Sequence, residues 1–116
     1  MAPAQLNTFL GLTMILVLET QGSLLYLFSS VTEAESHLEA IDIENHEYEF
    51  CDDTGQRFAG EITAPDTVFR AGRFRLRPQG VPDGSVVDSF VSRTCSLERV
   101  CDGVKTLDDL RRTNQA

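Results

Sequence analysis

The chemistry-bearing residues that dominate this sequence are carboxylates with no basic neighbours. The first 56 residues contain ten Asp or Glu and no Lys or Arg, whereas the other 60 hold all ten basic residues and eight acids. The formal charge is therefore −10 in the first part and +2 in the second, which gives the net −8 of the chain. A surface of one sign destabilises the folded state through self-repulsion unless a partner or an internal counter-charge offsets it.

Six of these carboxylates form a candidate partner-binding surface. Glu35 and Glu39 lie four positions apart on one predicted helix, a like-charged pair that costs about 0.2–0.5 kcal/mol. The predicted partner-binding set is Glu35, Glu39, Asp42, Glu44, Asp52 and Asp53. Complementary charge speeds association and excludes wrong partners, so this surface suits a basic protein. The alternative is a solvated surface that maintains solubility.

A second candidate site is a strand with three arginines on one face. Arg73, Arg75 and Arg77 alternate with Phe74 and Leu76. A guanidinium can bind phosphate or carboxylate in bidentate fashion, so the strand could hold a small anionic ligand. The alternative is a self-neutralising sheet surface, in which the arginines pair with carboxylates of neighbouring strands. Those carboxylates would be Glu47, Glu49 and Glu61.

The other reactive residues predict neither catalysis nor a metal or cofactor site. Cys51 ends a predicted strand beside Asp52 and Asp53, and these negative charges raise a thiol pKa and make it less nucleophilic. The two histidines, His37 and His46, have no spacing that fixes them near Cys51. The acids lack the spacing and the central Gly of an EF-hand loop. The chain contains no GxSxG, P-loop, GxGxxG or HExxH motif, so we expect no enzymatic activity.

Cysteine spacing and the N-terminal apolar segment bear on the cellular setting. Cys95 and Cys101 are separated by five residues, which matches no common zinc spacing and favours reduced thiols over a disulfide. The apolar stretch 9–28 is interrupted by Glu19 and a Gln-Gly-Ser turn, which disfavours a membrane helix. No basic residue precedes it, which disfavours a secretory signal. We therefore expect a cytoplasmic protein.

Length and charge limit the domain count and the partners. At 116 residues the chain fits one α+β domain, 1–116, with residues 1–13 as a peripheral extension if translation starts at Met14. Nucleic-acid binding relies on Lys and Arg that neutralise phosphates, and the net charge of −8 opposes it. The same charge opposes binding to an anionic membrane.

The predicted elements begin with an N-terminal hairpin and one short acidic helix. The apolar runs 15–18 and 24–28 flank the turn, and because neither run alternates we expect strands covered on both faces. Thr32 and Glu35 match a capping box for a helix at about 33–41. Its buried stripe would be Ala34, Leu38 and Ile41.

A central meander and C-terminal helices complete the predicted fold. Strands at 47–51 and 57–62 flank a strong turn signal at 52–55, and Val68 and Phe69 are expected to begin a further extended segment before the strand 73–77. Beyond a Pro/Gly loop at 78–84, four apolar residues with helical spacing predict a helix, and Thr106 opens a final short one. The fold class is α+β: an antiparallel sheet packed with one acidic helix and C-terminal helices.

The segment Leu24–Ile62 carries a family resemblance. Its sequence is LLYLFSSVTEAESHLEAIDIENHEYEFCDDTGQRFAGEI. An apolar strand ending in Phe, a short acidic helix, an Ile-Asp-Ile-Glu-Asn crossover and a hairpin resemble small bacterial immunity proteins of polymorphic toxin systems. The resemblance covers about a third of the chain and implies a cytosolic protein that binds and neutralises a basic toxin domain.

Two alternative functions remain open at the level of sequence. The apolar N-terminal strands could pair with another subunit, because a long apolar edge invites strand pairing, and the protein would then be an assembly module. The Arg73–Arg77 strand could instead bind a small anionic ligand. The sequence leaves the oligomeric state undetermined.

Overall fold

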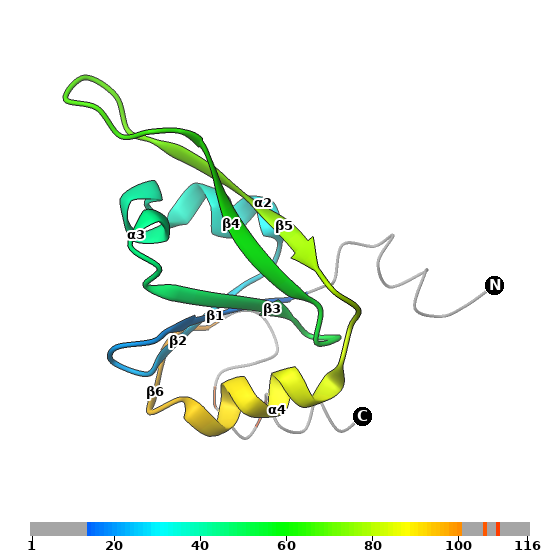
Figure 1. Cartoon of the computed structure of the whole chain (residues 1–116). Coiled ribbons are helices and arrows are strands. Elements are labelled where there is room, and N and C mark those ends of the chain that lie inside the picture. The colour runs from blue at the N-terminus through cyan, green and yellow to red at the C-terminus, as the bar shows by residue number, and fades with distance from the viewer. Residues whose placement is uncertain (1–13, 101–105, 107–108, 110–116) are drawn as a thin grey trace.

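The computed structural model describes residues 14–100, 106 and 109, and it is an α+β fold with a six-stranded mixed sheet (Figure 1). The strand order is β5-β4-β3-β1-β2-β6. The elements are β1 (Ile15–Glu19), β2 (Leu24–Phe28), α2 (Val31–His37), α3 (Ala40–Glu44), β3 (Tyr48–Asp52), β4 (Arg57–Ala64), β5 (Arg73–Gln79), α4 (Gly84–Arg93) and β6 (Ser96–Arg99).

Strand β1 lies inside the sheet and is buried on both faces. Leu16 and Leu18 belong to a core with α4, whereas Ile15 and Val17 belong to a second core with α2 and α3. The side chains of these four residues are at most 2% exposed. Successive side chains of a strand point to opposite faces, so a continuous apolar run needs cover on both. The structure confirms that expectation for this strand.

The predicted N-terminal hairpin is present, and β1 has a second antiparallel neighbour, β3, that the sequence did not predict. β1 pairs with β2, with Val17 opposite Tyr26, and also with β3, with Val17 opposite Phe50. β3–β4 and β4–β5 are antiparallel as well, which confirms the meander. The apolar side chains expected on its inner face all belong to the α2–α3 core: Tyr48, Phe50, Phe58, Ile62, Phe74 and Leu76.

The acidic helix differs from its prediction in start, length and buried face. Ser30, not Thr32, caps α2: its hydroxyl accepts a 3.0 Å hydrogen bond from the Glu33 amide. Leu38 is extended and ends the helix, and α3 begins after Glu39. Because this break rotates the chain, α3 buries Ala40 and Ile43 and leaves the expected core residue Ile41 42% exposed.

The C-terminal part contains one predicted helix and one strand that was not predicted. α4 buries the four residues with helical spacing, Val86, Val87, Phe90 and Val91. After it the chain turns back as β6, which pairs in parallel with β2 and makes the sheet mixed. The Thr106 hydroxyl accepts a hydrogen bond from the Asp109 amide at 3.1 Å, as an N-cap would. The rest of the predicted final helix lies outside the described residues.

The β3–β4 turn is tied to the start of α4. Gly55 has φ +88° and its carbonyl accepts a 3.2 Å hydrogen bond from the Asp83 amide. A Cβ at Gly55 would lie 1.9 Å from the Asp83 carbonyl oxygen. Asp83 caps α4 by accepting a hydrogen bond from the Ser85 amide. The turn therefore requires glycine for its conformation and for this close approach.

Alanine substitutions at Gly55 and Gly80 should distinguish the cost of a positive φ from the cost of the close approach to Asp83. Gly80 also has a positive φ, +69°, but a Cβ there would meet no described residue within 4 Å beyond its chain neighbours. Gly80→Ala should cost about 1–2 kcal/mol from backbone strain alone. Gly55→Ala should cost at least about 1 kcal/mol more, because the Asp83 contact must also shift. Urea unfolding of both variants measures the difference, and equal losses would contradict the close approach.

Candidate functional site

Three of the six predicted partner-binding residues form an acidic surface beside the β4–β5 hairpin. We define the acidic surface as Glu39, Asp42 and Glu44, on α3 and immediately before it. Glu39 and Glu44 are exposed and Asp42 is half-buried. Within the part of the chain that the structure describes, none of the three side chains forms an ion pair. These carboxylates remain available to an external partner.

Glu35, another of the predicted partner-binding residues, also has a role within the fold. Its carboxylate accepts a 2.8 Å hydrogen bond from the Leu76 amide of β5. β5 is an edge strand, and in an antiparallel ladder alternate amides point away from the neighbouring strand. Glu35 satisfies one of these outward amides, and Pro78, two residues further on, has no amide hydrogen. This arrangement protects much of the β5 edge against strand pairing.

Asp52 and Asp53, the last two predicted partner-binding residues, also accept hydrogen bonds within the fold. Asp52 is 8% exposed, and its Oδ1 accepts hydrogen bonds from the amide and hydroxyl of Thr54 and from the Gln56 amide. Such bonds to the following residues shape the turn. Asp53 Oδ2 lies 3.5 Å from the Met14 amide, and burial raises the pKa of this carboxyl. Both side chains therefore have hydrogen-bond donors within the protein.

The arginine strand is neutralised at one end only. Arg77 pairs with Glu61 on β4 at 3.2 Å, and Arg57 lies 3.6 Å from Glu49 on β3. Such exposed pairs contribute about 0–1 kcal/mol each. Arg73 and Arg75 are exposed and form no ion pair with any described residue. The predicted self-neutralising surface is thus present near β3 and absent toward the hairpin tip.

Glu49 connects the meander to α4 through a pairing that the sequence did not indicate. Both oxygens of Glu49 accept hydrogen bonds from Arg93, at 2.7 and 3.1 Å. The guanidinium groups of Arg93 and Arg57 lie 5.3 and 5.8 Å from the ring centre of Phe90. Cation–π attraction at such distances adds to the ion pair. Bonding by Arg93 lowers the pKa of the Glu49 carboxyl.

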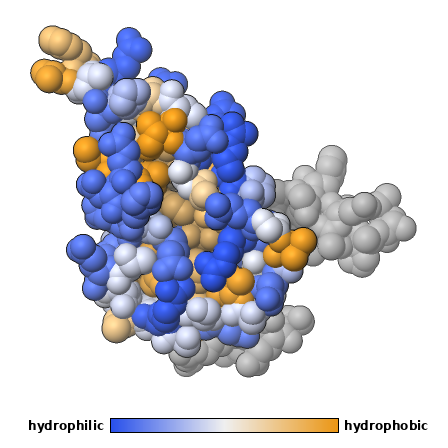
Figure 2. Space-filling view, in the orientation of Figure 1, coloured by the Kyte–Doolittle hydropathy of each residue, from blue (hydrophilic) through white to orange (hydrophobic). Residues whose placement is uncertain are grey.

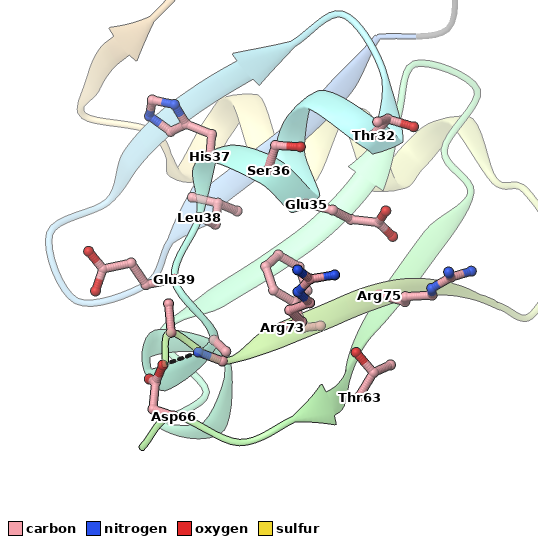
Figure 3. A pocket seen from close by; sticks show the side chains of 14 residues that line it. Thr32, Glu35, Ser36, His37, Leu38, Glu39, Thr63, Asp66, Arg73 and Arg75 are labelled. Carbon is pink, nitrogen blue, oxygen red and sulfur yellow. Dashed lines mark hydrogen bonds between the residues drawn. The ribbon is translucent and has the colours of Figure 1, made fainter. Parts of the chain in front are cut away.

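A groove of about 970 Å³ lies between α2 and the loop end of the β4–β5 hairpin. Figure 3 shows Glu35 on α2 and Arg75 on β5 near each other, with both side chains extending to the same side. Arg73, Glu39 and Asp66 also line the groove. A site that binds a small anion is expected to hold arginines without acidic neighbours. This groove does not meet that condition, because the carboxylates of Glu35, Glu39 and Asp66 line it together with the arginines.

The remaining reactive residues are separated from one another. Cys51 is buried, and burial raises its pKa to about 12, in the direction expected from the sequence. Cys95 is exposed, and Cys101 lies outside the described residues. His37 packs its ring 5.3 Å from the ring of Phe28. Among residues 14–100, no three His, Cys, Asp or Glu side chains are grouped so that they could hold a metal ion.

The sequence reasoning missed the exposed apolar tip of the β4–β5 hairpin. Val68 and Phe69 were expected to begin a strand, but they lie in a turn and are 94% and 98% exposed. Turn-forming residues stand on both sides of them, Pro65 and Asp66 before and Gly72 after. That flanking pattern could have indicated a loop.

Comparison with protein-family models, with curated proteins and with solved structures finds no match to this chain. Among the described residues, no helix has the length and apolar character needed to cross a membrane. The functional argument therefore rests on the residues and their geometry.

Removing the Glu35 carboxylate should expose the β5 edge. Glu35→Ala leaves the half-buried Leu76 amide without its acceptor, which should cost about 1–3 kcal/mol. We also expect faster aggregation on heating, because an open edge templates strand pairing. Glu39→Ala, an exposed acid nearby, should change neither property by much. Chemical unfolding and turbidity measure both effects, and indistinguishable variants would refute the edge-capping role.

Glu49→Gln should change the acid dependence of stability. The folded-state pKa of Glu49 is lowered, so its stabilising contribution is present above the unfolded pKa near 4.5 and is lost as the pH falls through the lower folded value. The variant should lose about 0.5–1 kcal/mol at pH 7 and show a flatter fall of stability below pH 5. Arg93→Gln should act likewise, and the double variant should add little. If the free energy of unfolding falls with pH in the same way for wild type and Glu49→Gln, the result would contradict a stabilising role of the Glu49–Arg93 pair.

Proposed function

We propose that this protein is a non-enzymatic, immunity-like inhibitor that binds and neutralises a basic toxin domain through the acidic surface. The single observation that carries the proposal is the contrast among its carboxylates. Glu33, Glu49 and Glu61 are paired with arginines, whereas Glu39, Asp42 and Glu44 have no such pairing among the described residues. The resemblance of Leu24–Ile62 to immunity proteins supports the same assignment.

The geometry of α3 favours an external partner for these acids. Three carboxylates on five-residue α3 and its N-cap repel one another at short range, and no described cation pairs with them there. Ala40 and Ile43 are buried in the core against the sheet and anchor α3 there. The acids are therefore presented on a fixed support, which lowers the entropy lost on binding.

Neutralisation needs only occupancy of the partner's binding site. Toxins that act on nucleic acids or nucleotides carry basic clefts for anionic substrates. A rigid acidic surface can cover such a cleft and imitate the charge of the substrate. The inhibitor then supplies no reacting group, which agrees with the high pKa of Cys51 and its burial.

The two alternative functions have less support from the geometry. The assembly route through the N-terminal strands lacks an open edge, because β1 lies between β3 and β2 and β2 lies between β1 and β6. Binding of a small anion is less favoured because Arg77 is paired with Glu61. The groove also contains carboxylates as well as Arg73 and Arg75.

Charge reversal on the acidic surface tests the proposal. The partner to test is the purified basic domain, if any, encoded by the adjacent gene. Glu39→Lys with Glu44→Lys should weaken binding to it by at least tenfold, about 1.4 kcal/mol. The salt dependence of the dissociation constant should flatten, since fewer charged contacts remain. Titration calorimetry at two salt concentrations gives both quantities.

A matched control removes the effect of net charge. Asp88→Lys with Glu98→Lys makes the same charge change at exposed positions on α4 and β6. This control should leave the affinity within about twofold of wild type, a change of only a few tenths of a kcal/mol. Equal weakening by both pairs would mean that only the overall charge matters. If the wild-type chain does not bind the protein encoded by the adjacent gene, that result would contradict the inhibitor function itself.

A further inference from the structure

The tip of the β4–β5 hairpin presents two apolar side chains to solvent. Val68 and Phe69 are 94% and 98% exposed. Figure 1 shows the hairpin extending beyond α3, and Figure 2 shows hydrophobic atoms at its far end. Scattered surface apolar residues are common, but an adjacent pair on a projecting turn has the form of an anchor.

The turn that carries this pair is held by its own hydrogen bonds. Thr67 and Arg70 exchange backbone bonds, at 2.9 Å from the Thr67 amide and 3.4 Å from the Arg70 amide. The Thr67 hydroxyl accepts a bond from the Phe69 amide at 3.3 Å, and the Asp66 carboxylate accepts one from the Gly72 amide. A tip ordered before binding loses less entropy when it docks.

The charge of the hairpin end is opposite to that of the protein. Arg70, Arg73 and Arg75 are exposed, and none forms an ion pair with a described residue. Asp66 is the one acid between positions 64 and 75, on a chain whose net charge is −8. An apolar tip with basic flanks is complementary to an apolar depression with carboxylates at its rim.

The groove beside the loop of the same hairpin offers carboxylates to such a tip. Its lining is mixed: Leu38 and the carboxylates of Glu35, Glu39 and Asp66 lie beside Arg73 and Arg75 (Figure 3). Its volume of about 970 Å³ lies near the top of the range of about 300–1,000 Å³ typical of ligand pockets, so two side chains fit.

We propose that two copies of this chain associate by exchanging hairpin tips, each tip seating Phe69 in the groove of the other copy. The groove lies beside the loop of the hairpin, where Gly72 and Arg73 line it. A twofold arrangement therefore lets both tips dock at once and closes the assembly as a dimer. Arg70 of one copy meets Glu39 of the other. This contact does not use β1 or β2.

An anionic membrane is the less favoured target of the tip. Glu39, Asp42 and Glu44 lie on the neighbouring α3, and the protein as a whole is acidic. Beyond about 8–10 Å these charges are screened at physiological salt, but the acids at the groove rim would approach a bilayer together with the tip.

Sedimentation velocity from about 1 μM to about 1 mM tests the exchange, the range in which a small interface associates. Wild type should pass from monomer to dimer, and Phe69→Ser should raise the dimer dissociation constant at least tenfold. Val81→Ser removes another exposed apolar residue, 83% exposed, outside the hairpin and should leave the constant unchanged. A monomer throughout, or a dimer that Phe69→Ser does not weaken, would overturn the proposal.

Charge exchange between the two predicted contact residues locates the interface. Arg70→Glu and Glu39→Arg should each weaken the dimer severalfold, and the double variant should recover most of the loss. Failure of that recovery would place the dimer contact elsewhere and overturn the exchange. Flotation with phosphatidylglycerol vesicles is the parallel measurement: Phe69-dependent vesicle binding by a monomeric protein would assign the tip to a lipid surface instead. None of these measurements requires the toxin.

Discussion

The structure depends on the burial of β1 on both of its faces. Four consecutive apolar side chains leave water, and each such burial contributes about 1.5–3 kcal/mol. A strand of this kind is stable only between two neighbouring strands and between two layers of cover. β2 and β3 supply the neighbours, α4 covers one face, and α2 with α3 covers the other. The outer strands β4 and β5 extend past this cover, which explains why their hairpin projects into solvent.

The uneven charge of the two halves of the chain is resolved in part by long-range pairing. Arg99 bonds Glu33 at 3.0 Å and stacks 4.8 Å from the ring centre of Phe28, and Arg93 binds Glu49. Each pair joins an acid of the first half to a base of the second. The carboxylates of Glu35 and Asp52 accept hydrogen bonds from backbone amides. Glu47 and the acidic surface at α3 have no such pairing among the described residues, and they are a small part of the acidic half from which they come.

The strands and their pairing were largely predictable from the sequence, because local patterns carry them. The hairpin, the meander and the helix at 84–93 follow from apolar periodicity and turn residues. The N-cap of α2 was not predictable, because Ser30 with Glu33 and Thr32 with Glu35 have the same capping-box spacing. In the structure the Glu35 carboxylate accepts a hydrogen bond from the Leu76 amide, 41 positions away, and Ser30 is the N-cap. β6 was missed since its four residues are stabilised mainly by their parallel pairing with β2.

The acidic surface and the hairpin tip lie at the same end of the molecule, so the two proposed contacts are coupled. Glu39 belongs to the acidic surface and also lines the groove that would receive the tip of a second copy. A dimer would therefore cover part of the surface meant for the toxin. By mass action, a toxin that binds only the monomer would dissociate the dimer, and its apparent affinity would fall as the inhibitor concentration rises. If both proposed contacts form, their shared use of Glu39 would make self-association and toxin binding compete.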